Sequence, residues 1–188
     1  MLIKSIKILS FLEDSILYDQ IQVTNEGHGD AHSLEACTVT FLRLNRVNPD
    51  TGENETRLLT HCQLCIENDE CFKISRILLD FVRLVKGYEG LKKVARNGCL
   101  GIMQCREMRR DIVAVYCALD ICIDELRMKQ VVNVREVIRN VRTQLNAPNT
   151  CFTTLGEYAC VFRALIRYSR LYGLSDRSNK YPKKINVL

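Results

Sequence analysis

The sequence has no apolar run long enough to cross a bilayer, which takes about 20 consecutive apolar residues. The apolar stretch near the N-terminus, Ile8 to Leu12, is short and lacks a small-residue cleavage site, so we expect no signal peptide. With 47% hydrophobic and 26% charged residues, the composition is that of a soluble globular protein. We therefore expect a cytoplasmic protein that makes no membrane contact.

The chain also lacks any recognised nucleic-acid motif and any interleaving of aromatic with basic residues. Its net charge is +5, and many basic residues lie near the C-terminus: Arg163, Arg167, Arg170, Arg177, Lys180, Lys183 and Lys184. A basic patch of this kind could attract an acidic partner or a nucleic acid. We interpret it instead as a solvated helix face followed by a frayed terminus, and we expect no nucleic-acid partner.

The ten cysteines are interpreted as reduced thiols, because several stand at apolar positions of expected helices and strands. The one metal-like cluster is His61-Cys62-x-x-Cys65 followed by Cys71. On a strand, Cys62 and Cys65 point to opposite faces and cannot hold one ion unless the chain turns between them. We therefore expect no metal and no cofactor.

The N-terminal half predicts a sheet. Cys37–Leu44 has the β-branched content and alternation of a strand, turn residues fill 48–52, and Arg57–Leu64 returns as the partner strand. Tyr18–Val23 is a further short strand, and Asn25–His32, with Gly27 and Gly29, is expected to be a loop.

The rest of the chain predicts four helices, with one more strand at Leu100–Met103 between the first and the second of them. Helix 73–86 is expected to stop at Gly87, and a second helix covers 109–128. Asn133 with Glu136 and Thr154 with Glu157 have capping-box spacing before two further helices. The core face of the last helix is predicted to contain Tyr158, Val161, Phe162, Leu165, Ile166 and Tyr168.

The stretch from Leu100 to Tyr168 resembles the C-terminal half of a protein tyrosine phosphatase domain. In that family a strand ends in H-C, a loop C-x5-R-[ST]-G cradles phosphate, and a long helix follows. Here the strand Leu100–Met103 leads to Gln104-Cys105, the loop reads Arg106–Asp111 without a glycine, and the helix is Ile112–Ile123. Thr153-Thr154-Leu155-Gly156-Glu157-Tyr158 stands where the family reads Q-T-x-x-Q-Y.

Upstream, Cys37–Leu44, Thr51-Gly52-Glu53 and Thr60-His61-Cys62-Gln63 resemble the family's hairpin. The resemblance implies an α+β fold, a twisted and mostly antiparallel sheet with C-terminal helices. It divides the chain into an N-terminal segment 1–17, a truncated, degenerate tyrosine-phosphatase-like domain 18–172 and a basic tail 173–188. That domain corresponds to the C-terminal two thirds of the family's. Polydnaviruses of insects contain degenerate family members, and this chain's divergence is similar to theirs.

The resemblance also implies that catalysis is lost. Family members attack phosphorus with a cysteine thiolate, stabilised by a glycine-rich loop, and clamp the phosphate with arginine. If Cys105 takes the nucleophile position, Asp111 takes that of the arginine and would repel phosphate. If the helix is aligned without a gap, Arg106 replaces the nucleophile and Ile112 the clamp.

The remaining catalytic positions are altered too. Asp69 falls on the general-acid position of the family's W-P-D loop, but the chain has no tryptophan and Asn68 replaces the proline. Thr153 and Glu157 replace the glutamines that position the hydrolytic water. We therefore expect no catalytic residues.

We expect a pseudophosphatase that acts by binding proteins or by self-association, and that alters host signalling from the host cytoplasm if the chain is viral. The interface would include the hairpin Cys37–Leu64 and the segment Ile3–Leu17. Two alternatives stay open. One is a tyrosine phosphatase with residual phosphotyrosine hydrolysis through Cys105, and the other is a decaying gene product without selected function.

Overall fold

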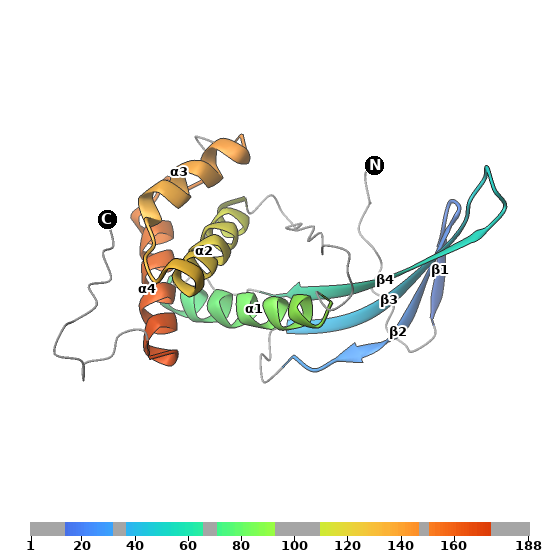
Figure 1. Cartoon of the computed structure of the whole chain (residues 1–188), viewed down its shortest axis with the longest axis horizontal. Helices are drawn as coiled ribbons and strands as arrows, with labels where there is room; N and C mark the ends of the chain where they lie inside the picture. The colour runs from blue at the N-terminus through green and yellow to red at the C-terminus, as the bar shows by residue number, and fades with distance from the viewer. Residues whose placement is uncertain (1–13, 32–36, 66–70, 93–109, 147–150, 174–188) are drawn as a thin grey trace. The chain divides into compact units, whose positions relative to one another are not determined.

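The computed structural model describes residues 14–31, 37–65, 71–92, 110–146 and 151–173. It has the predicted α+β class, with a four-stranded antiparallel sheet followed by four helices (Figure 1). The chain divides into two compact units, Met1–Cys65 with the sheet and Ile66–Leu188 with the helices, and each is described by itself. The narrower likeness to a tyrosine phosphatase stays a prediction, as do the domain boundaries at Tyr18 and Tyr172.

The sheet is a meander in which each strand pairs with the next along the chain. Its strands are β1 (Ser15–Tyr18), β2 (Ile21–Gly29), β3 (Cys37–Val47) and β4 (Asn54–Leu64). The order β1-β2-β3-β4 places the short β1 at one edge and the long β4 at the other (Figure 1). Leu100–Met103, the predicted further strand, lies outside the described residues.

The first prediction that the structure overturns is the single strand Tyr18–Val23. A turn at Asp19 and Gln20 breaks it into the end of β1 and the start of β2, with Tyr18 opposite Ile21. Asp19 has φ 54°, in the left-handed region that aspartate tolerates better than most residues. Tyr18–Val23 therefore makes a hairpin with the residues before it.

The expected loop at Asn25–His32 is wrong for its first part, because β2 continues to Gly29. A bulge between Asn25 and Gly27 absorbs one extra residue against β3. Gly27 has φ 130°, and the Asn25 Oδ1 atom accepts a hydrogen bond from its backbone N–H at 2.9 Å. Glycine in a strand is typical of a bulge, so the residues interpreted as a loop signal mark a kink in a strand.

The predicted hairpin between β3 and β4 is confirmed, with both strands longer than expected. Asn48 organises the turn: its Oδ1 accepts from the Asp50 N–H at 2.9 Å, and its backbone N–H donates to the Glu53 carbonyl at 2.8 Å. Gly52 has φ 70°, which requires the conformational freedom of glycine. This turn fixes the register of β4 against β3.

One face of the sheet carries an apolar cluster. Val23 and Leu42 are buried at its centre, with the partly buried Ile16, Tyr18, Ile21 and Leu44 packed around them. The register aligns Val23 with both Ile16 and Leu44, so the cluster runs across β1, β2 and β3. Leu59 of β4 lies opposite Leu42 on the same face but is 45% exposed. The cluster is therefore incompletely covered toward the β4 edge.

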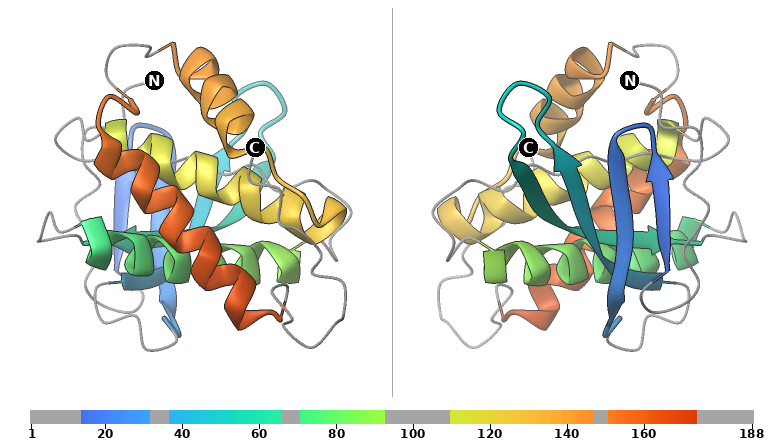
Figure 2. Two further views of the ribbon diagram at one scale, coloured as in Figure 1. Left: turned by 90° about the vertical axis from the view of Figure 1, so that its left-hand side faces the viewer. Right: turned by 90° about the vertical axis from the view of Figure 1, so that its right-hand side faces the viewer.

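The second unit contains α1 (Cys71–Lys92), α2 (Arg110–Lys129), α3 (Val134–Gln144) and α4 (Leu155–Leu171). Helix α4 crosses α1 and α2 and contacts both, while α3 contacts α2 (Figure 2). The most deeply buried side chains are Leu78, Leu79, Val82, Leu119, Cys122, Ile123, Val132, Val134, Cys151 and Val161. None of the helices within the described ranges is both long and apolar enough to span a membrane.

Gly87 does not end α1, contrary to the prediction, since the helix continues to Lys92. A glycine inside a helix costs about 1 kcal/mol relative to alanine. The neighbouring Lys86 offsets this cost, because its Nζ atom lies 2.6 Å from Asp120 Oδ1 and 2.9 Å from Asp124 Oδ2 of α2. The contact between helices, invisible in the local sequence, outweighs the stop signal.

Both predicted N-caps are confirmed. The Asn133 Oδ1 accepts from the Glu136 N–H at 3.1 Å, and the Thr154 hydroxyl accepts from the Glu157 N–H at 3.4 Å. Each cap satisfies a backbone donor that the first helical turn leaves without a partner. The two helices therefore begin where the sequence placed them.

The core face of α4 is partly different from the prediction. Val161, Leu165 and Tyr168 are buried as expected, but Ile166 is 49% exposed. Cys160 and Ala164 are buried in its place. Small side chains on this face allow close approach of the neighbouring helices.

Candidate functional site

The resemblance to a tyrosine phosphatase drew attention to five residues, and the structure describes three of them. Asp111 lies in the first turn of α2 and is partly buried, whereas Cys105 and Asp69 lie outside the described residues. A carboxylate in this turn interacts favourably with the positive end of the helix dipole. The same turn would have to attract phosphate in a phosphatase, and the charge of Asp111 opposes that.

Thr153 and Glu157, the other two residues, lie at the start of α4. Thr153 is exposed, whereas Glu157 is partly buried and bound to neighbouring residues. Its Oε1 accepts from the Thr154 hydroxyl at 2.8 Å, and its Oε2 accepts from the backbone N–H of Phe152. Thr154 thus caps the helix, and both carboxylate oxygens of Glu157 bind groups at the helix entrance.

Phe152 shows why this entrance needs support. It has φ 54°, a left-handed conformation that is unfavourable for an aromatic residue. The Glu157 carboxylate holds its N–H, and the ring of Tyr158 packs edge-on against its ring with centroids 5.4 Å apart. The side chain itself is buried. The contacts of Glu157 are therefore structural.

We expect Glu157→Ala to lower the free energy of unfolding by about 1–2 kcal/mol, because it leaves the Thr154 hydroxyl and the Phe152 N–H without their shared acceptor. Urea denaturation followed by far-UV circular dichroism measures the change. Glu157→Gln keeps an acceptor for Phe152 and should lose less than half as much. Equal stability of Glu157→Ala and the parent protein would contradict this role.

Three of the described thiols, those of Cys37, Cys117 and Cys122, are poor candidates for nucleophiles. Burial, with a smaller contribution from nearby Cys62 and Cys65, raises the pKa of Cys37 to about 11. Burial followed by the charge of Glu125 raises the pKa of Cys122 to about 12. Burial also raises the pKa of Cys117. A nucleophilic cysteine requires a lowered pKa, so these side chains act as small apolar groups.

The metal-like cluster of the sequence lies at the end of β4. His61 and Cys62 are within the strand, and Cys65 follows its last residue, Leu64. The strand is extended as predicted, so the side chains of His61 and Cys62 point to opposite faces of the sheet. Across the described ranges, no group of three or more histidine, cysteine or acidic side chains is placed to hold a metal ion.

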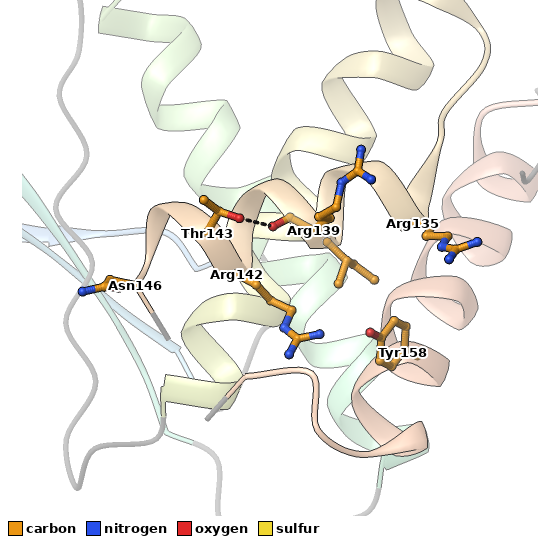
Figure 3. A pocket seen from close by; sticks show the side chains of 7 residues that line it. Arg135, Arg139, Arg142, Thr143, Asn146 and Tyr158 are labelled. Carbon is orange, nitrogen blue, oxygen red and sulfur yellow. Dashed lines mark hydrogen bonds between the residues drawn. The ribbon is translucent and has the colours of Figure 1, made fainter. Parts of the chain in front are cut away.

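A cavity of about 560 Å³ lies beside α3, with one lining residue on α4 (Figure 3). It is lined by Arg135, Ile138, Arg139, Arg142, Thr143, Asn146 and Tyr158. Arg142 extends from α3 toward Tyr158 of α4 (Figure 3). Arg139 forms an ion pair with Glu136, which neutralises part of the positive charge.

The chemistry of this cavity is that of binding. Guanidinium groups attract anions, but the described lining contains no cysteine, histidine or carboxylate that could act as nucleophile or general acid. This cavity was not predicted from the sequence. The sequence feature that could have indicated it is the spacing of Arg135, Arg139 and Arg142, which places all three on one face of a helix.

A second candidate surface is β4, where two consecutive leucines are exposed. Leu58 is 68% exposed and Leu59 is 45% exposed. Because neighbouring residues of a strand point to opposite faces, both faces of the sheet carry an apolar side chain next to this edge. Exposed leucines on a long edge strand are typical of a protein-binding surface.

Comparison with models of known protein families and with curated proteins finds no match to this chain.

Proposed function

We propose that this chain is a noncatalytic protein resembling a tyrosine phosphatase and that it acts by binding proteins. The observation that carries the proposal is the placement of acidic groups at catalytic positions. The Glu157 carboxylate binds the Thr154 hydroxyl and the Phe152 N–H at the start of α4, and Asp111 occupies the first turn of α2. Neither arrangement suits phosphate binding or the positioning of a water molecule.

Protein binding is favoured by the apolar edge of the first unit. The interface predicted from the sequence was the hairpin Cys37–Leu64 together with Ile3–Leu17. Residues 1–13 lie outside the described ranges, whereas the hairpin presents Leu58 and Leu59 to solvent. We place the protein in the cytoplasm, and in that of a host cell with an effect on host signalling if the chain is viral.

The purified protein should show no turnover of p-nitrophenyl phosphate or of phosphotyrosine peptides above the buffer rate. Loss of a single oxyanion donor already costs about 10² to 10³ in rate, and here the arginine clamp, the glycine loop and the water-positioning glutamines are all replaced. A continuous absorbance assay and a phosphate-release assay measure this.

The control is Cys105→Ser. Hydrolysis by the parent chain that Cys105→Ser abolishes would replace the proposal with a residual phosphatase. Hydrolysis that survives the substitution would point to a contaminating enzyme, which a second purification step removes.

A further inference from the structure

The cavity beside α3 carries positive charge that the proposed function does not use. Its volume of about 560 Å³ is within the range of about 300–1,000 Å³ that is usual for small-molecule sites. Its described lining residues lie on α3, at Asn146 just beyond that helix, and at Tyr158 of α4. The described part of the cavity is therefore a feature of the helical unit.

The charges of α3 are unequal. The helix contains three arginines, Arg135, Arg139 and Arg142, and one acidic residue, Glu136. Glu136 pairs with Arg139, whose side chain is 71% exposed. Within α3, the surplus is therefore two positive charges, and both of the other arginines line the cavity.

Arg142 lies where water screens its charge less than at the open surface. The residue is partly buried, and its Nε atom is buried. Ile138, one turn earlier on α3, also lines the cavity and is 2% exposed. A charge in partly apolar surroundings attracts an opposite charge more strongly than a charge in bulk water does. Arg142 is therefore the lining residue best placed to attract an anion.

Tyr158 adds a neutral hydrogen-bond donor. Its hydroxyl group and the guanidinium group of Arg142 point toward one another (Figure 3). The tyrosine ring packs against the ring of Phe152, with centroids 5.4 Å apart. The hydroxyl of Thr143, in contrast, donates to the Arg139 carbonyl at 3.0 Å. An anion in the cavity can thus accept hydrogen bonds from a guanidinium group and a tyrosine hydroxyl together.

Two acidic residues lie close to this site in the sequence, and both are bound to other groups. Glu136 pairs with Arg139. The oxygens of Glu157, which precedes the tyrosine, accept hydrogen bonds from the Thr154 hydroxyl and the Phe152 N–H. These contacts direct both carboxylates to partners other than a ligand in the cavity.

We infer that this cavity binds a small molecule through a phosphate group, held by Arg135, Arg142 and the Tyr158 hydroxyl. A phosphate group carries about 1.5 to 2 negative charges at neutral pH, which matches the surplus on α3. Its oxygens also accept paired hydrogen bonds from the planar guanidinium group. A carboxylate would neutralise only one of the two charges. The described lining contains no nucleophile or general acid, so the site binds its ligand without converting it.

Isothermal titration calorimetry of the full chain with inorganic pyrophosphate should show one site per chain, with a dissociation constant of about 1 mM or tighter. Inorganic phosphate is the second probe. Tighter binding of pyrophosphate than of phosphate would assign a ligand with two linked phosphate groups, and equal binding would assign a ligand with one.

Arg142→Met keeps an unbranched apolar side chain and removes the charge, and it should weaken pyrophosphate binding by at least about tenfold. The matched control is Arg167→Met, which removes the same charge from an exposed position of α4. Arg167 follows Tyr158 by nine residues. That separation is about 14 Å along a helix axis, which exceeds the Debye length of about 8 Å at physiological ionic strength. The control should change binding less than about twofold.

Two milder substitutions test the same site if Arg142→Met does not fold. Arg142→Lys keeps the charge but loses the planar fork, and it should weaken binding by about three- to tenfold. Tyr158→Phe keeps the ring against Phe152 and removes only the hydroxyl, so it should weaken binding by about two- to tenfold. Far-UV circular dichroism of each variant confirms folding.

A parent chain that binds no pyrophosphate at tens of millimolar would overturn the inference, as would binding that Arg142→Met and Arg167→Met weaken equally. Binding of polyglutamate without binding of pyrophosphate would also overturn it, because the ligand would then be an acidic protein segment. The turnover assay measures a different property, so the phosphate site and the proposed function fail separately.

Discussion

Leu119→Ala is expected to destabilise the helical unit by about 2–5 kcal/mol, because it removes a fully buried side chain and leaves a cavity. Leu119 has no exposed surface and lies on the face of α2 that also contains Ala118, Cys122 and Ile123. The neighbouring helices are too rigidly packed to fill the space completely. Urea denaturation followed by far-UV circular dichroism, which the helices dominate, measures the loss.

The matched control is Ile121→Ala on the same helix. Ile121 is 38% exposed, so its truncation removes fewer contacts and should cost less than about 1 kcal/mol. Both substitutions carry a similar change in helix propensity, and the difference between them isolates burial. A loss at Ile121 as large as that at Leu119 would show that α2 packs on a different face.

Lys86→Met should lower the free energy of unfolding by about 1–3 kcal/mol, because it leaves Asp120 and Asp124 facing each other on α2. The lysine side chain is 14% exposed, and it joins α1 to both carboxylates. A double-mutant cycle with Asp120→Asn measures the coupling. The control is Lys129→Met, whose pair with Glu125 is i,i+4 on one helix and whose side chain is 64% exposed.

The pH dependence follows from the pKa of Lys86. Burial opposes its charge, but the hydrogen bonds and charges of Asp120 and Asp124 outweigh burial and raise the pKa above 10.5. A raised pKa in the folded state gives stability that is present below the unfolded value of about 10.4 and is lost as pH rises through the folded value. The difference between the parent and Lys86→Met should therefore be constant near neutral pH and shrink in strong alkali. A difference that stayed unchanged in strong alkali would show that the charge of Lys86 does not carry the effect.

Local signals in the sequence identified most elements of the fold. The caps at Asn133 and Thr154 begin their helices because one side chain and a backbone N–H a few residues away decide the structure there. The turn at Asn48 and Gly52 is equally local, and it determines the hairpin. Such features depend on few neighbours and can be read from the chain.

The predictions from the sequence were wrong where residues far away in the chain determine the local structure. Gly27 signals a loop locally, but pairing with β3 makes it part of a bulge. Gly87 signals a helix end, but Lys86 is held by carboxylates on α2. In both cases hydrogen bonds or ion pairs to another element outweigh a local cost of about 1 kcal/mol.

The candidate site, too, could be predicted from the sequence only in part. The sequence by itself identified Glu157 as a capping residue, because capping depends on residue identity and spacing, and it predicted that acidic side chains replace the catalytic groups of a phosphatase. Only the tertiary structure showed that both Glu157 oxygens are bound, that three arginines of α3 line a cavity with Tyr158, and that Leu58 and Leu59 lie on an edge strand. Spacing along the chain determines which residues share a turn or a face, whereas exposure and edge position depend on which elements pack against that face.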